Sequence, residues 1–335
     1  MSKHTHPTDP AVIATGLVKQ FGETRAVDGV DLEVRRGEIF GVLGPNGAGK
    51  TTMLSMLATL LRIDAGEATV FGVDVRRRPH QVRQLIGVTG QYASVDENLT
   101  ASENLWLFGR LLGLPRAAAK ERATMLIEQF GLGEAADRQI ATFSGGMRRR
   151  LDLAASLIRR PPLIFLDEPT TGLDPRTRGQ MWDTIRELVA EGSTVLLTTQ
   201  YLDEADQLAD RVAVIDRGRK VAEGTTDELK TSVGASTLQL RLSDPDRLAS
   251  ATEILERALG ERPVLTPEAG GMKVALEAAD QAADALIALR QGDIGITSVS
   301  VSKPSLDEVF LALTGHDTRD SENPEPTGDR ELEAV

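Results

Sequence analysis

The 335-residue sequence predicts an α/β protein with a mostly parallel sheet, followed by a smaller α+β domain. Up to about residue 230, short apolar runs alternate with stretches of helical periodicity, as in βαβ units. A glycine-rich loop at residues 44–52 directly follows one such run. After about Thr231 the pattern changes to shorter, alternating segments. A chain of this length suits two domains better than one.

Local patterns in the first domain locate its elements. Residues 91–160 carry apolar residues at three- and four-residue steps, so we expect a mostly helical insertion there. Residues 216–219 separate two short apolar runs and predict a β-hairpin. We expect strands at residues 26–34, 38–43, 163–166 and 194–199, and helices at residues 50–61 and 176–190.

The second domain has its own pattern. We expect strands at residues 237–242, 272–277 and 297–301, and helices at residues 246–259 and 279–290. If residues 263–265 are also a strand, the order is β-α-β-β-α-β, a ferredoxin-like arrangement. Ser305 and Glu308 form a capping-box pattern that opens a last helix. We predict a disordered leader at 1–10, domains at 11–230 and 231–316, and a disordered acidic tail at 317–335.

Composition limits the classes of function. Hydrophobic residues make up 41% of the chain, enough for a sizeable core, and the absence of cysteine excludes disulfides and thiolate metal sites. A formal net charge of -12 disfavours nucleic acid as the main partner. The best apolar run, 53–61, is shorter than the roughly twenty residues of a membrane span. A membrane role would therefore depend on a separate partner.

The glycine-rich loop has the spacing that wraps backbone N–H groups around phosphates. Lys50 would reach the β- and γ-phosphates, and the Thr51 hydroxyl would hold Mg²⁺, which prefers oxygen ligands. The helix that follows presents its positive end to the same anion. The predicted phosphate-binding residues are Gly44, Pro45, Asn46, Gly47, Ala48, Gly49, Lys50, Thr51 and Thr52.

Two carboxylates follow the apolar run at 163–166. Asp167 can reach Mg²⁺ through water, and Glu168 can orient the attacking water or accept its proton. Acidic residues end many strands, so this pair indicates a catalytic site only in combination with the phosphate loop upstream.

A second glycine turn, formed by Ser144, Gly145 and Gly146, precedes a predicted helix about twenty residues before Asp167. Its glycines and the helix start also suit a phosphate. One ATP needs only one phosphate loop, so we expect the two turns to meet between two copies of the chain. For the arginines at 148–150 we favour a solvated helix face over contact with phosphate or the second copy.

In this order the motifs resemble the ATP-binding subunits of ABC transporters, over roughly residues 12–228. Residues 44–52 resemble the Walker A loop, Asp167 and Glu168 resemble Walker B and the catalytic glutamate, and residues 143–147 resemble the signature, with Phe for Leu and Met for Gln. The resemblance implies a P-loop NTPase fold with an antiparallel β subdomain and a helical subdomain at about 91–160. It implies ATP and Mg²⁺ as cofactors, with further roles for Gln91 (sensing Mg²⁺ and the membrane partner), Asp174 (D-loop) and Phe21 (stacking on adenine).

A narrower resemblance covers almost the whole chain. The segments at 88–96, 144–153, 198–206 and 306–316 are similar to the daunorubicin/doxorubicin-resistance ATPases of drug exporters. This implies a homodimer at the cytoplasmic face of the membrane, working through a separate integral-membrane permease on hydrophobic drugs. Trp106 and Phe108 are equally compatible with a permease-binding groove and with the core.

One position departs from the wider family. Gln200 stands where most members carry a histidine, and glutamine forms hydrogen bonds but carries no charge. The drug-resistance group shares this glutamine, so we expect turnover to survive. Slow hydrolysis, with binding alone switching the partner, remains an alternative. A soluble ATP-driven clamp on nucleic acid or ribosomes is a further alternative, which the single cassette and the acidic composition disfavour.

Overall fold

The computed structural model describes residues 10–90, 95–233, 236–266, 268–276, 278, 280–302 and 304–315. The chain forms two compact units, divided between Thr226 and Asp227, near the predicted boundary at 230. The predicted leader, apart from Pro10, and the predicted tail at 317–335 lie outside the described residues, and so does Gln91.

A six-stranded sheet forms the centre of the first unit, in the order β10-β9-β3-β8-β7-β6. All strands run parallel except β10, which pairs antiparallel with β9 in the predicted hairpin. Every residue of β3, β7 and β8 is buried, as expected for continuous apolar runs covered on both faces. The strands are β3 (Ile39–Leu43), β6 (Ile86–Thr89), β7 (Leu163–Asp167), β8 (Thr194–Thr199), β9 (Arg211–Asp216) and β10 (Arg219–Gly224).

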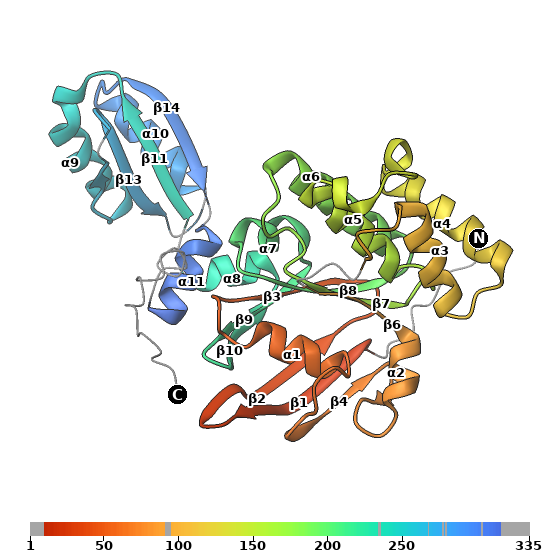
Figure 1. Cartoon of the computed structure of the whole chain (residues 1–335). Coiled ribbons are helices and arrows are strands. Elements are labelled where there is room, and N and C mark those ends of the chain that lie inside the picture. Colours follow the sequence, from red (N-terminus) through yellow and green to blue (C-terminus); the bar gives the residue numbers. More distant parts are fainter. Residues whose placement is uncertain are drawn as a thin grey trace, which may run out of the picture. The chain divides into compact units, whose positions relative to one another are not determined.

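An antiparallel sheet of order β2-β1-β4-β5 forms a second layer. Helix α1 (Lys50–Leu57) lies between the two sheets and packs its apolar side chains against both (Figure 1). The helix ends four residues before the predicted Leu61, because Thr59 takes a left-handed conformation with φ 64°. The strands are β1 (Val12–Phe21), β2 (Thr24–Val34), β4 (Ala65–Val70) and β5 (Val73–Asp74), and the short helix α2 (Pro79–Leu85) precedes β6.

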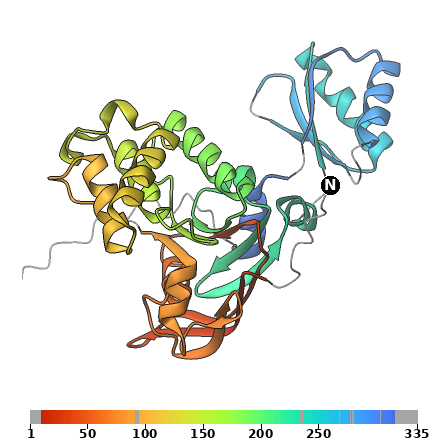
Figure 2. The ribbon, with the colours of Figure 1, turned by 90° about the vertical axis from the view of Figure 1, so that its right-hand side faces the viewer.

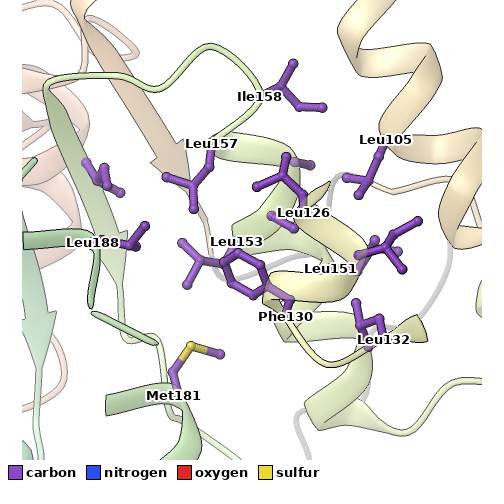
Figure 3. Close-up of a cluster of buried hydrophobic side chains, with 14 of the residues drawn as sticks. Leu105, Leu126, Phe130, Leu132, Leu151, Leu153, Leu157, Ile158, Met181 and Leu188 are labelled. Atoms are coloured by element: carbon purple, nitrogen blue, oxygen red, sulfur yellow. The ribbon is translucent and has the colours of Figure 1, made fainter. Parts of the chain in front are cut away.

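The predicted helical insertion contains α3 (Ala101–Leu111), α4 (Arg116–Gln129) and α5 (Gly145–Ser156), with single turns at Gly133–Ala135 and Ile140–Thr142. Thr100 and Glu103 form a capping box at the start of α3. A shared apolar cluster joins these helices to the large sheet and to α6 (Pro175–Ala190). Trp106 and Phe108 are partly buried against this cluster. Figure 3 shows its centre, where Leu126, Phe130, Leu151, Leu153 and Met181 gather.

The second unit confirms the ferredoxin-like order. Its sheet has the order β12-β13-β11-β14, with antiparallel pairing throughout. Leu238, Leu240 and Leu242 pack against α9 and α10, which lie on the same side of the sheet (Figure 2). The elements are β11 (Ser236–Leu242), α9 (Leu248–Leu259), β12 (Val264–Leu265), β13 (Gly271–Leu276), α10 (Gln281–Gln291) and β14 (Ile296–Ser302).

Two further helices connect strands: α7 (Leu202–Leu208) lies between β8 and β9, and α8 (Thr226–Val233) lies between β10 and β11. The last described helix, α11 (Leu306–Thr314), begins with the predicted capping box, in which Ser305 Oγ accepts from the Glu308 amide at 3.2 Å. Within the described part of the chain, no helix has the length and apolar character needed to cross a membrane.

Candidate functional site

The phosphate loop connects β3 to α1, as its spacing predicts. Gly49 forms the N-cap of α1 with φ 102°, a conformation that L side chains rarely adopt. A Cβ on Gly49 would collide with the carbonyl oxygen of Ala26, and one on Gly44 would collide with that of Ile215. Both glycines therefore allow neighbouring strands to approach the loop closely.

Lys50 points back over this loop. Its Nζ donates to the carbonyl oxygens of Gly44 (2.7 Å) and Pro45 (3.0 Å) and lies 3.5 Å from Glu168 Oε1. The residue is 4% exposed. Burial lowers the pKa of Lys50, whereas the charge of Glu168 acts in the opposite direction. The ammonium group is thus placed between the loop that would hold phosphate and a carboxylate.

Oxygen atoms gather where β7 ends. Asp167 Oδ1 accepts from Thr51 Oγ1 at 3.0 Å and from Thr198 Oγ1 at 2.5 Å. Hydroxyl and carboxylate oxygens are the ligands that Mg²⁺ prefers, so Thr51 and Asp167 suit this ion. Across the described residues, no group of three or more acidic or histidine side chains could hold a metal. A magnesium ion here would need further oxygen ligands from a nucleotide or water.

Glu168 has an unusual backbone conformation, with φ 47°. Its amide donates to both the carbonyl oxygen and the hydroxyl of Thr198, each at 3.1 Å. Its Oε2 accepts from Thr171 Oγ1 at 3.2 Å, while Oε1 faces Lys50. The carboxylate is therefore held from both sides. Thr198 and Thr171 were missing from the predicted site, although Thr198 is visible in the sequence as a polar residue ending an apolar run.

The favoured prediction of a solvated arginine face is wrong for Arg149. Its guanidinium donates to the main-chain carbonyls of Gly90, Asp167, Glu168 and Pro169. Five consecutive buried residues follow in α5, so this helix has no continuous solvated face. Arg149 therefore contacts the main chain at the border of the candidate site, and no sequence pattern indicated this.

The second glycine turn opens α5. Ser144 is the N-cap, and its Oγ accepts from the Met147 amide at 3.3 Å. Ser144 and Gly145 are exposed, whereas a Cβ on Gly146 would lie 2.6 Å from Thr177 Cγ2. Helices α1 and α5 lie on opposite sides of the six-stranded sheet (Figures 1 and 2). The turn is thus open to a ligand from outside the chain.

Asp174 caps the start of α6. Its Oδ1 accepts from the amides of Arg176 (3.1 Å) and Thr177 (3.0 Å), and its Oδ2 accepts from Thr177 Oγ1 at 2.6 Å. Hydrogen bonds from Thr177 hold the pKa of Asp174 below its ordinary value. Both carboxylate oxygens are therefore engaged within the chain.

The two remaining predicted residues lie at strand ends. Gln200 directly follows β8 and is partly exposed, and the ring of the next residue, Tyr201, lies 4.9 Å from the Arg178 guanidinium. Phe21 ends β1 with 49% of its surface exposed, and Lys19 Nζ lies 5.4 Å from its ring centroid. Both side chains are accessible to a ligand.

Comparison with known proteins places these features in a family. Residues 27–171 match the family described as ABC transporter, and residues 224–314 match the ATP-binding protein DrrA1-3-like, C-terminal domain. The chain is 56% identical to the daunorubicin/doxorubicin resistance ATP-binding protein DrrA of Streptomyces peucetius, over 95% of this chain and 96% of the relative. The chain belongs to the ATP-binding proteins of ABC transporters. Nucleotide binding and ATP hydrolysis are the activities of this family.

More distant relatives agree with this assignment. The chain is 36% identical to the linearmycin resistance ATP-binding protein LnrL of Bacillus subtilis, over 92% of this chain and 99% of the relative. An ATP-binding subunit of an ABC transporter of known structure is 27% identical, with TM-score 0.60 over 66% of this chain and 92% of that chain. An ATP-binding cassette solved as a dimer with ADP and Pi is 25% identical, with TM-score 0.59 over 64% and 98%. The P-loop NTPase fold is confirmed.

Proposed function

We propose that this ABC protein is the ATP-hydrolysing subunit of an exporter that moves anthracycline-like or other hydrophobic drugs through a separate integral-membrane permease. Relatives at 56% and 49% identity carry the names of daunorubicin resistance proteins, and one at 36% is named for linearmycin resistance. Within the chain, the observation that carries the proposal is the meeting of the phosphate loop with the end of β7, where Lys50 Nζ lies 3.5 Å from Glu168 Oε1. This enzyme would act at the cytoplasmic face of the membrane.

The chemistry follows from the side chains. The loop amides and Lys50 would bind the β- and γ-phosphates, and Thr51 and Asp167, with Gln91, would hold Mg²⁺. A bound Mg²⁺ would neutralise charge that develops on the phosphates. Glu168 would accept the proton of the attacking water, and Gln200 would donate a hydrogen bond to the γ-phosphate. Phe21 would stack on the adenine ring.

The second glycine turn would act in trans. Ser144, Gly145 and Gly146 would bind the ATP held by the phosphate loop of a second copy, with Asp174 near the same interface. Exposure of Ser144 and Gly145, together with the dimeric structure of a related cassette, supports this arrangement. Two ATP molecules would then be enclosed by one homodimer.

A mixing experiment tests the shared site. S144R and K50A copies are each expected to be inactive when alone. A mixed dimer would still contain one intact pocket, formed by the Lys50 of one copy and the Ser144 of the other. Mixtures should therefore recover part of the parental ATPase rate. No recovery, despite dimer formation between tagged copies, would refute binding in trans.

The catalytic assignment is tested by E168Q, measured with and without the co-expressed permease. Loss of a general base lowers the rate by about a hundredfold to ten-thousandfold. ATP binding should persist, since Glu168 is not assigned to the phosphates. Drug or dye accumulation in cells should rise for K50A and E168Q relative to the parent.

Gln200 favours one second candidate, a nucleotide-gated regulator in which binding switches the partner and turnover is slow. Glutamine at this position cannot take up the proton that a histidine would accept. Equal, very low phosphate release by the parent and by E168Q, with the permease present, would favour the regulator.

A further inference from the structure

Arg149 joins the two strand ends that border the proposed site. Its Nη2 donates to the carbonyl oxygens of Asp167 (2.6 Å) and Glu168 (3.0 Å), and its Nε donates to that of Pro169 (3.1 Å). Its Nη1 donates to the carbonyl oxygen of Gly90. A planar guanidinium with five N–H donors is suited to several acceptors in fixed positions.

These acceptors lie where strand pairing stops. Strands β6 and β7 are neighbours in the parallel sheet, and their pairing ends at Thr89 and Leu166. Among the described residues β6 and β7 do not pair beyond this point, whereas Asp167 still pairs with Thr198 of β8. Main-chain carbonyls shielded from water need a donor, and Arg149 supplies one to each of the four. At Glu168 the chain also takes a φ of 47°, a region that residues with a Cβ rarely adopt. Arg149 therefore supports a main-chain turn that does not form easily by itself.

We propose that Arg149 is a positioning residue for ATP hydrolysis. It holds the main chain of Glu168 so that the carboxylate faces Lys50, and it fixes Gly90, the residue before Gln91 in the sequence, to the same point. This inference rests on the proposed role of Glu168 as the group that activates water. Because Arg149 bonds to carbonyl oxygens and not to the Glu168 carboxylate, its loss changes the position of that group rather than its charge.

The helix that carries Arg149 also carries the second glycine turn. Arg149 lies on α5, whose N-cap is Ser144, the residue proposed to bind the ATP held by the second copy. The same short helix therefore connects the glycine turn directed to one nucleotide with the carboxylate directed to the other.

The test compares R149Q, R149K and R149A with the parent in the full-length chain. Lysine keeps the charge but lacks the planar fork, so R149K should not restore activity. We expect kcat to fall by about tenfold to a hundredfold, as for other small displacements of reacting groups. The KM for ATP should stay within about twofold, because no phosphate contact is removed. Added guanidinium should partly restore kcat in R149A.

Arg122 provides a matched control. In α4 it donates to the carbonyl oxygens of Leu157 (2.8 Å) and Ile158 (3.3 Å), beyond the opposite end of α5. Burial lowers its pKa, as it does for Arg149. R122Q should therefore lower thermal stability in the same way as R149Q but keep the parental kcat. Equal losses of kcat in R122Q and R149Q would overturn the proposal.

Hydrogen exchange gives a readout that does not depend on turnover. R149Q should raise exchange in peptides covering residues 86–90 and 165–170 together, and R122Q should leave both unchanged. Unchanged exchange in R149Q would overturn the inference. If the parent hydrolyses ATP no faster than E168Q, the proposed function fails, and the exchange data still decide whether Arg149 ties the two strand ends.

Discussion

Replacing Thr198 by valine removes one hydroxyl from the centre of the site without changing the shape of the side chain. Thr198 is fully buried, its Oγ1 donates to Asp167 Oδ1 at 2.5 Å, and it accepts from the Glu168 amide at 3.1 Å. A hydrogen bond to a charged group contributes about 1.5–3 kcal/mol. Asp167 Oδ1 keeps its bond from Thr51, so we expect T198V to lower the free energy of unfolding by about 2 kcal/mol.

Urea unfolding measures this loss in the first unit alone. Both tryptophans of the chain, Trp106 and Trp182, lie in that unit, so fluorescence follows its unfolding. Thr194 provides a control on the same strand: it is 1% exposed, and its Oγ1 accepts from the Gly37 amide at 2.9 Å. Loss of this neutral bond should lower stability by about 1 kcal/mol in T194V. A loss in T198V no larger than in T194V would refute the argument that the charge of Asp167 strengthens the Thr198 bond.

Two further predictions concern packing and pH. G146A should lower stability by about 1–3 kcal/mol, since its Cβ would lie 2.6 Å from Thr177 Cγ2. The double variant G146A/T177S, which lacks that methyl group, should recover most of the loss, and equal stability of single and double variants in urea would contradict this. Glu204 is fully buried, and burial raises its pKa above the ordinary 4.5. The contribution of Glu204 to stability should therefore be greatest below pH 4.5 and be lost as the pH rises through the raised pKa, so E204Q should be more stable than the parent at pH 8 and equal to it near pH 4. A stability difference that does not change with pH would contradict the assignment.

The sequence predicted those parts of the site, such as the phosphate loop, whose chemistry requires particular residues at fixed spacings. A phosphate loop requires glycines at set spacings, so its position between β3 and α1 could be derived before the fold. Strand β8 was predicted to the residue, because a continuous apolar run bounded by polar residues permits one buried strand. The ferredoxin-like order also followed from local patterns, since buried and exposed residues alternate over most of β11 and β13.

In the antiparallel layer the predicted strand at 26–34 is confirmed as most of β2, but β1 and β4 were harder to predict because they depend on their partners. Strand β1 carries irregular pairing between Ala14 and Leu17, where Gly16 takes a positive φ, and this breaks the alternation that would reveal it. Strand β4, Ala65–Val70, is short, and its apolar residues are interrupted by Gly66, Glu67 and Thr69. Pairing to β1 forms this strand, and such long-range pairing leaves little local signal.

The contacts of Arg149 could not be predicted from the sequence for a different reason, which is the kind of group that it binds. Its partners are four main-chain carbonyls, and every residue has a carbonyl, so no residue type in the sequence marks the acceptors. Helical periodicity did not distinguish Arg149 from its neighbours either. Helix α5 is buried at five consecutive positions from Leu151 to Ala155, so each of the three preceding arginines lies one turn from a buried residue. Side chains that act on the substrate are chosen for their chemistry and form motifs. A side chain such as Arg149, which binds main-chain carbonyls, has a role only where the ends of two strands lie side by side. The pairing of strands in the folded sheet determines that place.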